Sequence, residues 1–192
     1  MLGELVSRYK TPFVPFPENP KTIKIGQFEV FEYISPEMML KYIRQFAYKV
    51  DFNEFNHVAV NLNGGLFLFN ELTKIKGYDK PPILIEYHRP QNGFGSIETI
   101  PVPKELSDKK ILIVDDIFDS GGVLKGIFAK VGQDSRAIVA VTKNGIEGQL
   151  KDPRIGVAVK INNVWIGGYG MDLGVKGEGQ VFREHPGIVV KK

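Results

Sequence analysis

Short apolar runs alternate with amphipathic stretches along this chain. The run FEVFEYI at residues 28–34 is typical of a strand. A helix is predicted from Ser35, a good N-cap residue that Pro36 follows at the first helical position, as far as Lys49. Its apolar face would be formed by Met39, Tyr42, Ile43 and Phe46.

The alternation continues to residue 142. Helices are expected from the turn Asn63-Gly64-Gly65 to about Ile75, and from Ser120 to Val131. Because strands and helices take turns along the chain, we expect an α/β fold with a mostly parallel twisted sheet flanked by helices. The expected strands lie at 57–62, 82–87, 109–114 and 137–142.

Two segments break the pattern. Residues 11–20, TPFVPFPENP, carry four prolines and are expected to form an extended arm. Residues 89–100, RPQNGFGSIETI, are rich in turn formers and are expected to form a mobile loop. Without a repeat or a low-complexity linker, the 192 residues are expected to form one domain, 1–192.

The run ILIVDDIFDSGG at residues 111–122 joins four apolar residues to three acids. Asp115, Asp116 and Asp119 would repel one another unless a cation or hydroxyl groups lie among them. In open α/β sheets, ligands bind beyond the carboxyl ends of the strands. The acids are therefore predicted to belong to a site and not to the core.

Two glycines follow the acids and precede a helical pattern. Gly121 and Gly122 let the backbone curl so that its N–H groups face a ligand, and a helix start adds partial positive charge. Together these features favour a phosphate cup. Acids upstream can accept hydrogen bonds from sugar hydroxyls, so the pattern indicates a ribose phosphate. The alternative is an ordinary loop in which Asp119 or Ser120 caps the helix.

Composition narrows the chemistry. The chain has no cysteine, which excludes disulfides, thiolate nucleophiles and zinc–thiolate sites, and its net charge of +3 is dispersed. It lacks the basic face of a duplex binder, an apolar run of about 20 residues and the pattern of a signal peptide. We expect small anionic ligands, no nucleic acid, no membrane and a cytoplasmic location.

Three motifs together resemble a known family. VDDIFDSGGVL is similar to the ribose-phosphate signature of the type I phosphoribosyltransferases, which use phosphoribosyl pyrophosphate. VNLNGGLFLFNEL, residues 60–72, resembles the first loop of that family. VWIGGYGMDLG and VFRE, within residues 164–184, resemble the 6-oxopurine branch, which comprises the hypoxanthine, guanine and xanthine enzymes.

The resemblance implies both architecture and activity. A small hood is expected from an N-terminal arm and strand, 1–34, and from a C-terminal base-binding segment, 164–192. The implied reaction transfers the phosphoribosyl group to a 6-oxopurine, which gives a purine nucleoside monophosphate and pyrophosphate, as in purine salvage. Mg²⁺ is the implied cofactor, and a homodimer or homotetramer is expected.

The resemblance also assigns roles to matching residues. Asp119 would be the general base, Asp115 and Asp116 would face the ribose hydroxyls, and these two with Asp172 would hold metal. The base would be bound by Lys143, which reads the 6-oxo group, and by Trp165, Ile166 and Asp172. Phosphoribosyl pyrophosphate would be bound by Asp115, Asp116, Asp119, Ser120, Gly121, Gly122, Val123, Asn63, Gly64 and Arg183.

The sequence departs from the family pattern at three places. Asn63 stands where the family often has Lys, and Val123 where it usually has Thr. The mobile loop carries no Ser-Tyr pair in YHRPQNGF, residues 87–94, where Arg89 could serve the pyrophosphate instead. The open alternatives are an enzyme for orotate, uracil or adenine, and a regulatory protein that senses phosphoribosyl pyrophosphate. The preferred 6-oxopurine is left open.

Overall fold

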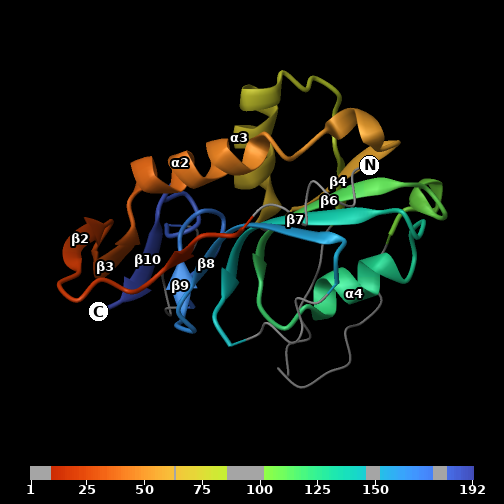
Figure 1. Ribbon diagram of the computed structural model, residues 1–192. Helices are drawn as coiled ribbons and strands as arrows, with labels where there is room; N and C mark the ends of the chain where they lie inside the picture. Colours follow the sequence, from red (N-terminus) through yellow and green to blue (C-terminus); the bar gives the residue numbers. More distant parts are fainter. Residues whose placement is uncertain (1–9, 63, 86–101, 146–151, 175–180) are drawn as a thin grey trace.

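A six-stranded parallel sheet forms the centre of the molecule, for which a computed structural model describes residues 10–62, 64–85, 102–145, 152–174 and 181–192 (Figure 1). The strand order is β1-β8-β7-β6-β4-β5, and every neighbouring pair is parallel. The strands are β1 (Phe13–Val14), β4 (His57–Asn61), β5 (Ile83–Ile85), β6 (Ile111–Phe118), β7 (Arg136–Lys143) and β8 (Ile155–Ile161).

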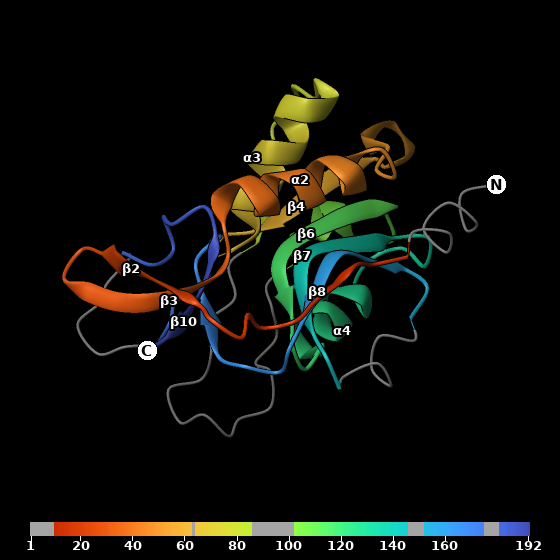
Figure 2. The ribbon, with the colours of Figure 1, turned by 60° about the vertical axis from the view of Figure 1, so that its left-hand side comes forward.

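Helices cover both faces of this sheet, as the alternating pattern predicts. Helices α2 (Pro36–Ala47) and α3 (Gly65–Lys76) lie over one face, and α4 (Gly122–Phe128) lies under the other (Figures 1 and 2). The predicted N-cap of α2 is confirmed, since Ser35 accepts a hydrogen bond from Met38 N. Each face carries its own apolar cluster, so both faces of the sheet are core. None of the helices in the described part of the chain is long and apolar enough to cross a membrane.

A second sheet brings the two ends of the chain together. It is antiparallel, in the order β2-β3-β10-β9, and it stands to one side of the central sheet (Figure 2). Its strands are β2 (Lys21–Ile25), β3 (Phe28–Ile34), β9 (Ile166–Gly167) and β10 (Ile188–Lys191). The expected hood of N- and C-terminal segments is therefore present. The proline-rich arm contributes β1, which extends the edge of the central sheet beside β8.

Several predicted boundaries were wrong. Strand β6 does not end at 114 but continues through the acids to Phe118, because β7 pairs with it along its length. Helix α4 begins at Gly122 and not at Ser120, because Gly121 before it has a left-handed backbone conformation. It ends at Phe128 and is therefore shorter than predicted. The two 3₁₀ turns, Phe52–Glu54 and Lys104–Leu106, and strands β1, β2, β8, β9 and β10 were not predicted. The loop 89–100 lies outside the described residues.

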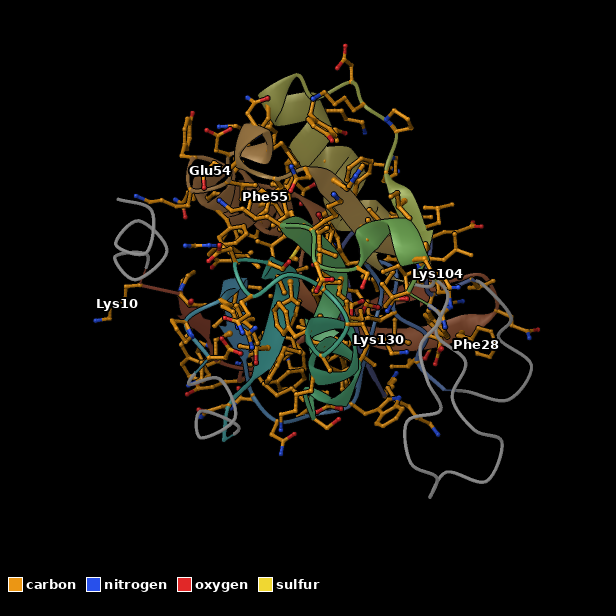
Figure 3. The ribbon with its side chains drawn as sticks, turned by 90° about the vertical axis from the view of Figure 1, so that its right-hand side faces the viewer. Lys10, Phe28, Glu54, Phe55, Lys104 and Lys130 are labelled. Atoms are coloured by element: carbon orange, nitrogen blue, oxygen red, sulfur yellow. The ribbon has the colours of Figure 1, made fainter. Side chains whose placement is uncertain are left out.

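Buried polar side chains gather at one end of the central sheet. Of the five found among the described residues, Asn61, Asp115, Thr142 and Lys143 lie toward the carboxyl ends of their strands. At the other end, Lys110 Nζ lies 4.0 Å from Glu54 Oε2 and 5.3 Å from the centroid of the Phe55 ring. Glu54 and Phe55 are labelled in Figure 3. A partly exposed pair of this kind adds little stability. The buried polar side chains, in contrast, are concentrated at the carboxyl end of the sheet.

The hydroxyl group of Tyr33 joins the arm, the hood and the central sheet. It accepts a hydrogen bond from Asn162 N over 2.7 Å and lies 2.9 Å from Val14 O. Asn162 Oδ1 in turn accepts from Phe16 N over 2.6 Å. Burial raises the pKa of Tyr33, so the phenol stays protonated and able to donate at neutral pH.

Replacement of this hydroxyl group should destabilise the fold. We expect Tyr33→Phe to lower the free energy of unfolding by about 1–2 kcal/mol, because it leaves partly buried polar partners unpaired. Urea unfolding followed by circular dichroism measures the change. Tyr48→Phe is the matched control, since Tyr48 is 81% exposed. Equal midpoints for the two variants would contradict a clamping role for Tyr33.

Candidate active site

A cavity of about 350 Å³ opens at the carboxyl ends of β4, β6 and β7, with the hood beside it. Every site residue predicted from the sequence lines this one cavity, apart from Asn63, which lies outside the described residues. The set comprises Gly64, Asp115, Asp116, Asp119, Ser120, Gly121, Gly122, Val123, Lys143, Trp165, Ile166, Asp172 and Arg183. Their roles remain predictions, but the structure brings the residues together.

The adjacent acids Asp115 and Asp116 are enclosed by the protein at the cavity wall. Asp115 is 3% exposed, and its Oδ1 accepts hydrogen bonds from Asn61 Nδ2 and from Asp116 N, each over 2.9 Å. Asp116 Oδ1 accepts from Ile117 N over 2.8 Å. The sequence reading placed these acids in a site and not in the core, whereas Asp115 belongs to both.

Burial makes this pair of carboxyl groups unfavourable in its charged form. Burial raises the pKa of Asp115 well above its ordinary value, and the neighbouring Asp116 raises it further. Burial also raises the pKa of Asp116, although its hydrogen bonds to Asp115 and to backbone amides, and to a lesser extent Arg183, oppose that rise. A carboxyl whose pKa is raised by folding stabilises the fold at low pH and loses that contribution as the pH rises through its folded value. At neutral pH a cation or hydroxyl donors would relieve the pair.

Two glycines of the first loop allow close approach to these acids. A Cβ on Gly64 would overlap the carboxylate of Asp116, and one on Gly65 would overlap the carbonyl oxygen of Val114. Gly64 has a φ of −142°, which other residues can adopt, so space is the reason for glycine at 64. The first loop therefore packs directly on the end of β6.

The turn from β6 into α4 depends on a glycine for its shape. Gly121 has a φ of +72°, and a Cβ there would lie 2.6 Å from the ring of Phe118. Gly121 is the N-cap, and no side chain caps the helix. The alternative reading, with Asp119 or Ser120 as an ordinary cap, is therefore wrong. The amides at the start of α4 are left without a side-chain cap, as an anion cup requires.

An ammonium group, a carboxylate and an aromatic ring lie close together in the cavity. Lys143 is buried, and its Nζ lies 3.4 Å from Asp119 Oδ2 and 5.6 Å from the centroid of the Trp165 ring. Trp165 is 56% exposed, and its Nε1 donates to Leu173 O over 2.6 Å. A fixed and exposed aromatic ring beside a donor and an acceptor suits a planar polar ligand.

The turn after β9 contacts both Arg183 and the first loop. Arg183 Nη2 donates to Asp172 Oδ2 and its Nη1 donates to Gly170 O over 2.7 Å. Gly170 in turn packs on Gly64, because a Cβ at 170 would overlap the carbonyl oxygen of Gly64. The hood turn and the first loop are thus in direct contact.

The acids of the predicted metal set do not converge on one point. Asp172 is paired with Arg183. Within the described ranges, no three His, Cys, Asp or Glu side chains are placed to hold an ion together. Any Mg²⁺ site here would need ligands from the substrate as well as from the protein.

Five lining residues were missed by the sequence reading. Asn61 stands at the end of an apolar strand, so the strand-end rule that selected Asp115 could have selected it too. The others are Ile117, Phe118, Leu124 and Met171. As apolar residues they carry no signal in the sequence that separates them from the core.

Comparisons with solved structures fit this geometry. A hypoxanthine-guanine-xanthine phosphoribosyltransferase matches with a TM-score of 0.59 and 19% identity over 84% of this chain and 93% of the other. A hypoxanthine-guanine phosphoribosyltransferase from Bacillus anthracis gives 0.56 and 18% over 90% and 98%. A hypoxanthine phosphoribosyltransferase from Staphylococcus aureus gives 0.58 and 18% over 84% and 90%.

These matches establish the class of fold. The chain has the type I phosphoribosyltransferase fold, with a parallel sheet between helices and an antiparallel hood. No protein-family model matches the sequence, and no curated protein does. At 18–19% identity the structural likeness concerns the fold, so the activity has to be argued from the site.

Proposed function

We propose that this protein transfers the phosphoribosyl group of phosphoribosyl pyrophosphate to a 6-oxopurine base. The observation that carries the proposal is the meeting of Asp119, Lys143 and Trp165 in one cavity with the acid pair and the glycine turn. These residues come from three separate segments of the chain. A base site, a ribose site and a phosphate site thereby lie next to one another.

The ribose phosphate would occupy the β6 side of the cavity. Backbone amides of residues 119–123 would bind the 5′-phosphate, and Asp115 and Asp116 would accept hydrogen bonds from the ribose hydroxyls. Pyrophosphate would lie against Gly64 and its neighbour Asn63, with Arg183 as the cation. Val123 offers the phosphate no hydroxyl group, so the backbone amides carry most of that contact.

The purine would occupy the hood side. Trp165 would stack on the ring with Ile166 beside it, and Lys143 would donate to the 6-oxo oxygen. Asp119 would remove the proton from the purine nitrogen as that nitrogen bonds to C1 of the ribose. The bond from C1 to pyrophosphate breaks in the same displacement, and the two substrates must be held in line for it.

The residues present could supply some of the ligands of Mg²⁺, and the substrate would supply the others. Two adjacent carboxyl groups with raised pKa values invite a cation, and Mg²⁺ is commonly held by one or two carboxylates together with substrate phosphates. Asp115 and Asp116 would hold it, with Asp172 available once it leaves Arg183. When bound, the ion would neutralise charge on the departing pyrophosphate.

The names of the three structural neighbours support the 6-oxopurine branch without choosing among its bases. Turnover should be measured by pyrophosphate release from phosphoribosyl pyrophosphate with hypoxanthine, guanine, xanthine, adenine, orotate and uracil, with Mg²⁺ and with a chelator. We expect turnover with at least one 6-oxopurine, and only when Mg²⁺ is present. Turnover confined to the other bases would mean a different enzyme of this fold, and binding without turnover would mean a sensor. A cytoplasmic location and a homodimer or homotetramer remain predictions.

Removal of the lysine ammonium should change the choice of base. We expect Lys143→Ala to reduce kcat/KM for the best 6-oxopurine about tenfold or more, because a charged donor to the oxo group is lost. Affinity for phosphoribosyl pyrophosphate should change much less, since Lys143 lies on the base side. Calorimetry and competition between the oxopurine and adenine measure the two effects. If the Lys143→Ala variant has the same base preference as the parent, Lys143 has only a structural role.

A further inference from the structure

Asn61 ends β4 with a buried carboxamide after three apolar residues of the strand. Val58, Ala59 and Val60 are buried in the core, and Asn61 is only 9% exposed. An apolar side chain would satisfy the packing at this position. An amide there needs partners for both of its ends, because an unpaired amide group in a dry interior is unfavourable.

One end of the Asn61 amide is satisfied and the other is not. Nδ2 donates to Asp115 Oδ1 over 2.9 Å, whereas Asn61 Oδ1 is buried and has no hydrogen-bond partner among the described residues. A half-satisfied amide makes a poor structural element, because the desolvation of its free oxygen opposes the gain from its single bond. The group that benefits from that bond is Asp115.

The bond from Asn61 fixes the direction of the Asp115 carboxyl group. Asp116 N donates to the same oxygen over 2.9 Å, so Oδ1 receives one donor from its own strand and one from β4. Two donors on one oxygen determine the plane of the carboxyl group and the position of its second oxygen. Asp115 lines the cavity, so this orientation is presented to the ligand.

We propose that Asn61 is a positioning residue that orients Asp115 toward a ribose hydroxyl of phosphoribosyl pyrophosphate, at the expense of the stability of the fold. The proposal rests on the function proposed above. Asn61 lines the cavity, but its free oxygen is closed off from solvent and its Nδ2 donates to Asp115, so it would act through Asp115. Stability and affinity should therefore respond in different ways to its replacement.

Asn61→Leu tests this separation, because Leu is close to Asn in shape and carries no donor. We expect the affinity for phosphoribosyl pyrophosphate with Mg²⁺, measured by calorimetry, to fall about tenfold or more. The KM for phosphoribosyl pyrophosphate should rise in step while the KM for the base stays the same. The thermal midpoint should stay within about 3 °C of the parent or increase. Asn70→Leu, an exposed position on α3, is the matched control.

Asn61→Asp is the second variant, because it keeps the size of the side chain and replaces the amide donor with a carboxyl group that repels Asp115 when ionised. It should weaken binding at least as much as Asn61→Leu does. A large fall in the midpoint of Asn61→Leu, or its failure to fold, would overturn the proposal by making the amide a structural element. Unchanged affinity in a folded variant would overturn it as well. If the parent protein does not bind phosphoribosyl pyrophosphate, both the proposed function and this inference are wrong. If the parent and both Asn61 variants bind it equally well, only this inference is wrong.

Discussion

Asp119→Asn should lower kcat by about 10²–10⁴-fold, the range that a positioned general base contributes. Asn keeps the size of the side chain but cannot take a proton from the purine. Asp119 does not cap α4, whose N-cap is Gly121, so the substitution leaves the helix start intact. The ion pair with the buried Lys143 is lost, but the Asn oxygen can still accept a hydrogen bond from Nζ and position 119 is partly exposed, so little stability should be lost.

Asp116→Asn provides the contrast to Asp119→Asn. Asp116 lies against Gly64, at the proposed ribose end of the cavity. Its replacement removes a charged acceptor, which should weaken binding of phosphoribosyl pyrophosphate by about tenfold to hundredfold. Calorimetry with Mg²⁺ gives the affinities, and steady-state turnover gives kcat. Normal turnover by Asp119→Asn would exclude its role as the base and strengthen the sensor alternative.

The fold could be predicted wherever the sequence pattern matches a buried surface. Strand β3 has the predicted bounds, and α2 begins after the predicted N-cap, because burial of one face and a local cap determine both. The two-residue strands β1 and β9 exist only through their pairing with distant strands, so no local pattern marks them. The extension of β6 to Phe118 has the same origin, since β7 supplies its hydrogen bonds.

The candidate site was predictable where one segment carries its own chemistry. The acids and glycines after Val114 indicate a ligand site without any other segment, because so many charges at the end of a strand would be unfavourable in a core. The partnership of Asn61 with Asp115 was not predictable, since it depends on β4 lying beside β6. The contact between Gly64 and Gly170 likewise joins segments that only the tertiary fold brings together.

Gly64→Ala should weaken binding of phosphoribosyl pyrophosphate by about 100-fold or more, because two contacts to the ligand are disturbed at once. The added methyl group would overlap the carboxylate of Asp116, so either the acid or the first loop must move. Movement of the acid removes a ribose contact, and movement of the loop removes a pyrophosphate contact. The carbonyl of Gly64 also packs on Gly170, which leaves the loop little room to retreat.

Gly77, at the other end of α3, provides a control that separates weaker ligand binding from an ordinary loss of stability. Gly77 follows α3 with a φ of +66° and has open space around it, so Gly77→Ala strains the backbone without approaching the cavity. We expect Gly77→Ala to lower the free energy of unfolding by about 1 kcal/mol and to leave binding unchanged. Gly64→Ala should show the reverse balance, with the larger change in binding. Calorimetry and urea unfolding on both variants decide the matter. Equal affinity in Gly64→Ala and the parent would mean that the first loop does not meet the ligand, and the ribose and pyrophosphate sites would then have to be placed elsewhere in the cavity.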